Sequence, residues 1–321
     1  MTALEQHLLD IIQDAFPLEE CPYQVLADML NMQGSAGETS SEPLTEQQVF
    51  DAVEGLRLSG IIRRIGGVYD SKKLGFISRL CAGKVTDIDE FTAAVNEIPA
   101  ITHNYVRSHE YNVWFTVIAE NEGDIRQIVD KLCALAKLHD VHILSVTKKF
   151  KIDTVMTRGE RRLAAGMAPS EPKETGMLSV SDKNRIQIAC GDIPHSLTPF
   201  ADWGVSVEEL RDDLAQKRMR RFGAILRHQQ AGFANNAMVC FADSGVENAG
   251  EILARNPHVS HCYERPAFEG FPYTLYAMMH AQSAAELERY IGEASDSIGN
   301  PDCAVLHSLR ELKKTSYRFF E

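Results

Sequence analysis

The sequence predicts an α+β protein made by tandem duplication, in which each half joins a winged helix-turn-helix to a ferredoxin-like βαββαβ domain. Three observations predict this fold class. First, short amphipathic helices precede a basic segment that reads as a strand. Second, strand and helix patterns then follow in the order βαββαβ. Third, both of these features recur in the second half of the chain. A length of 321 residues is enough for several domains with cores of their own.

Residues 1–75 are predicted to form the first winged helix-turn-helix. Apolar residues at helical spacing predict three short helices, and Thr45 with Gln48 forms a capping box at the start of the third. The segment 60–69, Gly-Ile-Ile-Arg-Arg-Ile-Gly-Gly-Val-Tyr, is predicted to be a two-stranded wing.

Residues 76–152 are predicted to form the first ferredoxin-like domain. Strands and helices are expected in the order βαββαβ at 77–85, 90–98, 102–107, 112–119, 123–137 and 142–151. Helices cover one face of such a sheet. The other face must therefore be covered by a partner sheet or by a ligand.

The second half of the chain repeats this plan. Residues 153–181 lack periodicity and are predicted to be a linker. Residues 182–233 are predicted to be a shortened winged helix-turn-helix, with a first helix at 184–193 and a capping box of Ser206 and Glu209. Residues 234–321 are predicted to be a second ferredoxin-like domain, with elements at 237–242, 246–255, 259–264, 273–281, 284–294 and 304–312. Matches such as Gly66 with Gly223, at nearly constant spacing, indicate an internal duplication.

Composition and charge limit which kinds of partner the protein is expected to bind. The net charge of −12 is unsuited to nucleic acid unless a basic surface gathers locally. No apolar run approaches the length of a membrane span, and the start lacks the regions of a signal peptide. The seven cysteines are scattered without a Cys-x-x-Cys pair, so neither a disulfide framework nor a metal site is signalled. A cytoplasmic protein without membrane contact is expected.

The residues best suited to chemistry occur twice, in the pattern His-x-Tyr-x-Arg. Alternate side chains of a strand share one face, so each pattern predicts a row of three side chains. The two rows are His103, Tyr105 and Arg107, and His261, Tyr263 and Arg265. A proton donor, a phenol and a fixed cation on one face can hold a carboxylate and transfer a proton. The alternative is that these are satisfied core residues, kept alike by the duplication.

Further basic residues gather near the predicted wings and at the ends of the repeats. The pair Arg63 and Arg64 recurs in the second half as Arg220 and Arg221, Arg227 follows in the second half, and Lys149 lies at the end of the first repeat. Such arginines can clamp several carboxylates, although a solvated surface is the alternative. The third helix of each half instead carries exposed acids, among them Glu46, Asp51, Glu208 and Asp212. Carboxylates repel phosphates, so DNA binding is not expected.

These residues resemble a known family. The runs Arg220-Arg-Phe-Gly-Ala and His261-Cys-Tyr-Glu-Arg-Pro, with the segment 60–70, are similar to the siroheme decarboxylases, a non-regulatory offshoot of the Lrp/AsnC regulators. The resemblance covers nearly the whole chain outside the linker, and it is to the fused form that joins two related subunits. It implies removal of CO2 from two acetate side chains of siroheme, in the routes to haem and haem d1. No organic cofactor is implied, because the conjugated macrocycle takes up the electrons and the iron comes with the substrate.

The resemblance also implies roles for the residues above. His103 and His261 are the expected proton donors, supported by Tyr105 and Tyr263, and either histidine is a candidate ligand of the substrate's iron. The expected substrate-binding residues are Arg63, Arg64, Arg107, His109, Trp114, Lys149, Arg220, Arg221, Arg227, Arg265 and Tyr273, with Tyr111 and Tyr276 also against the macrocycle. The two repeats are expected to pair as a pseudo-dimer. Which repeat is active, a further homo-oligomer and a paralogous partner subunit are left open.

Two other functions fit part of the pattern. A transcription regulator of the Lrp/AsnC type would bind a small effector and DNA, and it requires basic recognition helices. A haem- or siroheme-binding protein without catalysis would bind the tetrapyrrole and leave its mass unchanged.

Overall fold

The computed structural model describes residues 2–34, 42–152, 178–226, 235–314, 317 and 319–320. The chain divides into two compact units, and each unit takes segments from both halves of the sequence. Unit 1 comprises residues 1–74, 155–231 and 318–321, which include both helical regions. Unit 2 comprises residues 75–154 and 232–317, which include both ferredoxin-like repeats.

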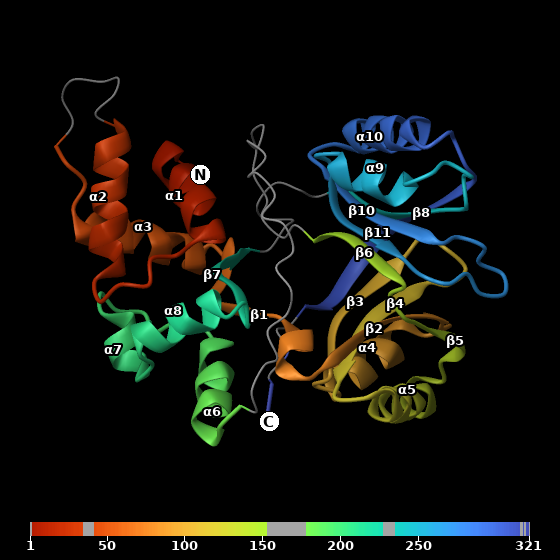
Figure 1. The fold of residues 1–321 in the computed structure, drawn as a ribbon, viewed down its shortest axis with the longest axis horizontal. Coiled ribbons are helices and arrows are strands. Elements are labelled where there is room, and N and C mark those ends of the chain that lie inside the picture. Colours follow the sequence, from red (N-terminus) through yellow and green to blue (C-terminus); the bar gives the residue numbers. More distant parts are fainter. Residues whose placement is uncertain are drawn as a thin grey trace. The chain divides into compact units, whose positions relative to one another are not determined.

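Unit 1 contains two sets of short helices, each followed by one strand (Figure 1). The first set is α1 (Ala3–Asp14), α2 (Pro22–Gly34), α3 (Glu46–Leu58), β1 (Ile62–Tyr69) and the 3-10 turn η1 (Ser71–Leu74). The second set is α6 (Val180–Ala189), α7 (Pro199–Trp203), α8 (Val207–Ala215) and β7 (Met219–Leu226).

Helix caps explain where several of these helices begin. The predicted capping box of Thr45 and Gln48 is present at α3. At α8 only half of the predicted box forms, because Ser206 accepts from the Glu209 amide while the Glu209 carboxylate bonds Arg185. Helix α6 begins earlier than predicted, inside the predicted linker, because Ser179 and Asp182 cap it. The rest of the predicted linker, residues 153–177, lies outside the described residues.

The predicted two-stranded wing at 60–69 is wrong. This segment forms the single strand β1, which pairs antiparallel with β7 from the other half. Gly66 and Gly223 face each other at the middle of this pairing. A Cβ at Gly66 would lie 2.2 Å from the Gly191 carbonyl oxygen, and one at Gly223 would lie 2.5 Å from that of Ile12. Glycine at these two positions therefore allows the neighbouring backbone to approach closely.

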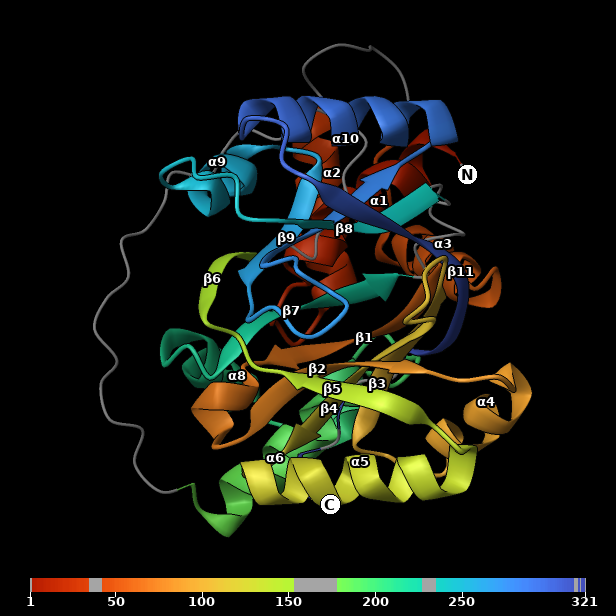
Figure 2. The same cartoon turned by 90° about the vertical axis from the view of Figure 1, so that its right-hand side faces the viewer.

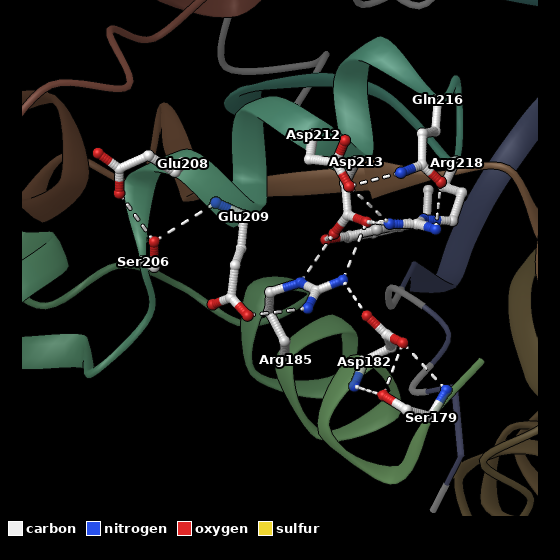
Figure 3. Close-up of polar contacts among 11 residues, drawn as sticks. Ser179, Asp182, Arg185, Ser206, Glu208, Glu209, Asp212, Asp213, Gln216 and Arg218 are labelled. Atoms are coloured by element: carbon white, nitrogen blue, oxygen red, sulfur yellow. Dashed lines mark hydrogen bonds and ion pairs between the residues drawn. The ribbon is translucent and has the colours of Figure 1, made fainter.

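A buried ion network in unit 1 is centred on Asp213 (Figure 3). Asp213 of α8 is fully buried and accepts from Arg185 of α6 at 3.2 Å and from Arg218 at 2.8 Å. The Tyr69 hydroxyl of β1 donates to the same carboxylate at 2.8 Å. Every partner of this buried carboxylate is a hydrogen-bond donor, so the charge is compensated. We expect the network to hold α6, α8 and β1 together.

Unit 2 contains the βαββαβ order twice, as predicted. The first repeat is β2 (Ile77–Lys84), α4 (Ile88–Asn96), β3 (Ile101–Arg107), β4 (Val113–Ala119), α5 (Glu122–Ala136), β5 (His139–Leu144) and β6 (Lys148–Ile152). The second repeat is β8 (Asn235–Phe241), α9 (Ala249–Arg255), β9 (Val259–Glu264), β10 (Leu275–Ala281), α10 (Ala284–Ser297) and β11 (Cys303–Lys314).

The strands of the two repeats are hydrogen-bonded into one sheet. Among the described residues its order is β5-β2-β4-β3-β11-β8-β10-β9-β6. Strand β11 pairs with β8 through its first half and with β3 of the other repeat through its second half. The predicted single strand 142–151 is wrong, because β6 separates from β5 and pairs with β9. The last strand of each repeat thus pairs with a strand of the other repeat. The sequence pattern within one repeat does not predict this exchange.

Unit 2 is layered, with helices outside and strands inside. Helices α4 and α5 cover one side and α9 and α10 the opposite side, with the strands between (Figures 1 and 2). Each helix pair packs on its own repeat through a separate apolar core. A third core, the inner core, contains residues of both repeats, including Trp114, Met238, Tyr276 and Leu306. The free faces of the two repeats therefore cover each other, as in a pseudo-dimer.

Across the described ranges, no helix has the length and apolar character that crossing a bilayer requires.

Candidate functional site

The two His-Tyr-Arg rows lie on strands β3 and β9 and share the inner-core side of the sheet. Tyr105 is opposite Trp114 in the β3–β4 pairing, and Tyr263 is opposite Tyr276 in the β9–β10 pairing. Residues directly opposite in a ladder point to the same face. Because Trp114 and Tyr276 belong to the inner core, both rows face it. We call His103, Tyr105 and Arg107 the first row, and His261, Tyr263 and Arg265 the second row.

A β-bulge precedes the histidine of each row. In β3 the register passes from Ile101 to His103 while the partner strand advances one residue, so Thr102 is the extra residue. In β9 the register passes from Val259 to His261 in the same way, so Ser260 is extra. Bulges redirect the side chains that follow them and are frequent next to active sites. The strand pattern did not predict these bulges, although a hydroxyl residue, Thr102 or Ser260, directly precedes each histidine.

Each half-buried histidine contacts the hydroxyl of its bulge residue. His103 Nδ1 lies 2.9 Å from Thr102 Oγ1, and His261 Nδ1 lies 3.0 Å from Ser260 Oγ. In the second row the imidazole ring also lies alongside Tyr263, with ring centroids 6.4 Å apart and an angle of 29°. The contact through Nδ1 leaves Nε2 as the nitrogen that can exchange a proton with a ligand.

The two row arginines are buried beneath tyrosines. Arg107 is 4% exposed and Arg265 is 7% exposed, and their Cζ atoms lie 4.9 Å and 5.2 Å from the ring centroids of Tyr105 and Tyr263. Arg107 donates to the Leu306 carbonyl at 3.1 Å, and Arg265 donates to the Leu144 carbonyl at 2.9 Å. Each arginine thus reaches a strand of the opposite repeat.

The positive charge of these arginines has little compensation. Within the described part of the chain neither makes an ion pair with a carboxylate, and the Nε of each is buried without a hydrogen-bond partner. Burial lowers the pKa of both guanidinium groups. Carbonyl oxygens and ring faces stabilise a buried cation only in part. The two rows therefore favour an anion nearby.

The two rows differ in the residues beside them on β6 and β11, the strands that pair with the other repeat. Lys149 of β6 lies opposite Tyr263, whereas Glu311 of β11 lies opposite Tyr105. Opposite the histidines, Ile152 pairs with His261 and Lys314 pairs with His103. The second row thus gains a base at Lys149, and the first row gains an acid at Glu311. An anionic ligand with an apolar ring favours the second row.

Five other predicted residues lie around Phe271. Trp114 is 1% exposed, and its indole donates to the Tyr111 carbonyl at 2.8 Å. Trp114 is therefore a core residue without surface for a ligand in this conformation, and so are Tyr111 and Tyr276, each 2% exposed. Tyr273 is half-buried with its ring edge-on to Phe271, and burial raises its pKa. His109 is half-buried, burial lowers its pKa, and its Nδ1 accepts from the Tyr111 amide.

The remaining predicted arginines belong to unit 1. Arg64 donates to the carbonyls of Gly191 and Gly67, and burial lowers its pKa to about 10. Arg221, at the matching position, donates to the carbonyls of Gln13 and Ala224. These two arginines support the backbone around the β1–β7 pairing. Arg220 pairs with Asp70 at 3.2 Å and Arg63 lies half-buried in β1, whereas Arg227 lies outside the described residues. Their predicted contact with substrate stays a prediction.

Metal binding by the protein itself finds no support in the described part of the chain. No group of three or more His, Cys, Asp or Glu side chains is gathered there to hold an ion.

Comparisons with known proteins agree with this architecture. Residues 73–151 and 230–313 match the family model of the AsnC-like ligand binding domain. Over 331 aligned positions the chain is 30% identical to a siroheme decarboxylase of Hydrogenobacter thermophilus, covering 98% of this chain and 94% of that protein. The chain belongs to the siroheme decarboxylase family. The predicted family and the predicted fold class are both confirmed.

Other members of the siroheme decarboxylase family show the same relation. The alpha subunit of the enzyme from Desulfovibrio desulfuricans is 42% identical over 156 residues, which are 47% of this chain and 82% of that subunit. The crystal structure of the siroheme decarboxylase NirDL matches with a TM-score of 0.67 and 27% identity, covering 99% of this chain and 94% of that one. A second structure of NirDL, in complex with an iron-uroporphyrin III analogue, matches with a TM-score of 0.66.

Proposed function

We propose that this chain removes CO2 from two acetate side chains of siroheme, giving didecarboxysiroheme in haem or haem d1 biosynthesis, and that the second row carries the reaction. The observation that supports this most strongly is the uncompensated positive charge beside a histidine. Arg265 is buried and pairs with no acid in the described part of the chain, and Lys149 lies opposite Tyr263 on the same face. Siroheme carries eight carboxylates on an apolar macrocycle, so it suits such a surface.

The chemistry requires a proton and a desolvated carboxylate. The bond between the acetate methylene carbon and its carboxyl carbon breaks, CO2 leaves, and the bonding electrons pass into the conjugated macrocycle. The carbon then takes a proton and becomes a methyl group. We assign the proton donor to His261 Nε2, with the Tyr263 hydroxyl as a supporting donor. The apolar surroundings of the row disfavour the charged carboxylate and favour release of neutral CO2.

The basic residues of the row have distinct roles in this proposal. Lys149 is exposed and is the residue that contacts a substrate carboxylate directly. Arg265 is nearly buried, so it acts through its positive field beneath the Tyr263 ring. In the first row Glu311 weakens the field at the matching place, so that row is the less active one.

Two rival functions make different demands on the chain. A DNA-binding regulator needs basic recognition helices, but α3 and α8 carry acids, and Glu208, Glu209 and Asp212 lie together beside Arg185. A carrier needs only binding. We propose a cytoplasmic enzyme without DNA or membrane partners.

Anaerobic incubation of the purified chain with siroheme, followed by mass spectrometry of the tetrapyrrole, tests the proposal. The expected product has lost two CO2 units. Tight binding with unchanged mass would support a carrier, and retention of duplex DNA that falls steeply with salt would support a regulator. Either result would overturn the proposed function.

Charge reversal at matched positions tests the choice of row. Lys149→Glu is expected to weaken binding of iron-uroporphyrin III about tenfold, because a unit charge near a surface carboxylate is worth about 1 kcal/mol or more. The matched variant Glu311→Lys is expected to leave that binding nearly unchanged. Both residues are exposed, so neither change should disturb the core. Absorbance titration gives the two dissociation constants. Tighter binding in Glu311→Lys, with no change in Lys149→Glu, would assign the ligand to the first row.

A further inference from the structure

The bulge in β9 places a hydroxyl between the histidine and a strand carbonyl. Ser260 is the extra residue of the bulge, so it has no cross-strand partner in the β9–β10 register. Its Oγ lies 3.1 Å from the Met278 carbonyl oxygen and 3.0 Å from His261 Nδ1. The hydroxyl thus connects the backbone of β10 to the imidazole of the second row.

This contact fixes where the imidazole carries its proton. A carbonyl oxygen only accepts, so the single hydroxyl proton of Ser260 is donated to Met278. Ser260 Oγ can then only accept from the ring, which requires a proton on His261 Nδ1. In the neutral ring Nε2 therefore has the lone pair, and in the charged ring Nε2 is the nitrogen that can release its proton.

We infer that Ser260 is a positioning residue for the decarboxylation, which holds the His261 ring in place and keeps Nδ1 protonated so that Nε2 alone exchanges a proton with the substrate. This inference rests on the proposed function of the second row. The sequence pattern His-x-Tyr-x-Arg does not include Ser260, and the serine acts without touching the substrate. Its role follows from the bulge, because a serine in regular β9 register would point to the opposite face from His261.

The first row provides an internal comparison. Thr102 occupies the matching bulge position and contacts His103 Nδ1 at 2.9 Å. Among the described residues the Thr102 hydroxyl makes no second hydrogen bond, so its proton is free to be donated to His103 Nδ1. The tautomer is therefore fixed by a strand carbonyl in the second row only. This difference agrees with the choice of the second row as the catalytic one.

Two variants of Ser260 distinguish the effect of its hydroxyl group from the effect of its side-chain volume. Ser260→Ala removes the acceptor of the Nδ1 proton, and Ser260→Thr keeps a hydroxyl, as the first repeat does naturally at Thr102. In full-length protein with 15N-labelled histidine, at about pH 8 where an ordinary imidazole is neutral, long-range 1H–15N correlation spectra show which nitrogen carries the proton. The His261 signals are identified by their loss in His261→Ala.

The expected result has a spectroscopic part and a kinetic part. Wild-type protein and Ser260→Thr show His261 protonated on Nδ1, whereas Ser260→Ala shows the proton moved to Nε2 or shared. Decarboxylation of siroheme falls roughly tenfold to a hundredfold in Ser260→Ala, the range for residues that orient a functional histidine, and is restored in Ser260→Thr. The pH dependence of kcat shifts only in Ser260→Ala.

Failure of this inference is distinct from failure of the proposed function. If the wild-type chain decarboxylates siroheme but Ser260→Ala keeps both the Nδ1 proton and the pH profile, the positioning role is wrong. If the wild-type chain does not decarboxylate siroheme, the proposed function fails, and the spectra still report whether Ser260 sets the tautomer. A parallel loss of activity in Ser260→Ala and Ser260→Thr, with the tautomer unchanged in both, would also contradict the inference.

Discussion

Replacement of His261 by alanine is expected to lower kcat for siroheme decarboxylation by about 10²–10⁴-fold, which is the range for removing a general acid. The ring is half-buried on a strand whose backbone pairing does not depend on it, so the fold should persist. Binding of iron-uroporphyrin III should change much less than kcat, because Lys149 and Arg265 remain. Single-turnover kinetics with siroheme separates the two effects.

The matched variant for this prediction is His103→Ala. The two histidines occupy equivalent positions after equivalent bulges, so the two changes perturb the sheet alike. Because Glu311 lies opposite Tyr105, we expect the loss in His103→Ala to be less than about tenfold. A larger loss in His103→Ala than in His261→Ala would move the reaction to the first row. Full activity in both single variants and in the double variant would exclude the histidines as proton donors.

Replacement of Asp213 by alanine is expected to lower the free energy of unfolding by about 3–5 kcal/mol, the range for breaking a buried ion pair. The change leaves Arg185 and Arg218 without their shared buried carboxylate, and it removes the acceptor of the Tyr69 hydroxyl. Figure 3 shows how Arg185 and Arg218 converge on Asp213. Urea unfolding followed by far-ultraviolet circular dichroism measures the effect.

A neighbouring residue supplies the control for this stability prediction. Asp212 is exposed and contacts Arg218 at 3.4 Å, so Asp212→Ala should cost less than about 1 kcal/mol. Equal effects of the two changes would show that burial of the Asp213 carboxylate does not matter. The two His-Tyr-Arg rows belong to unit 2, so we expect Asp213→Ala protein that is still folded to keep its kcat.

Local patterns predicted much of the fold and of the site from the sequence. The βαββαβ order followed from apolar periodicity, and the alignment of each His, Tyr and Arg on one face followed from the two-residue repeat of a strand. The family followed from motifs such as Arg220-Arg-Phe-Gly-Ala. These features depend only on neighbours in the chain.

What the sequence did not predict depends on distant pairing. The β1–β7 ladder and the exchange of β6 and β11 between repeats join segments more than a hundred residues apart. The burial of Arg107, Arg265 and Trp114 follows from the packing of one repeat on the other, which no local pattern encodes. The contrast between Lys149 and Glu311 appears only once these exchanged strands are in register.

A crystal structure of this chain with bound iron-uroporphyrin III would show whether the second row holds the tetrapyrrole. We expect the macrocycle to lie against His261 and Tyr263, with His261 Nε2 turned toward it and the Lys149 ammonium on a carboxylate. A macrocycle bound at His103 alone, or away from both rows, would show that the second row is not the binding site.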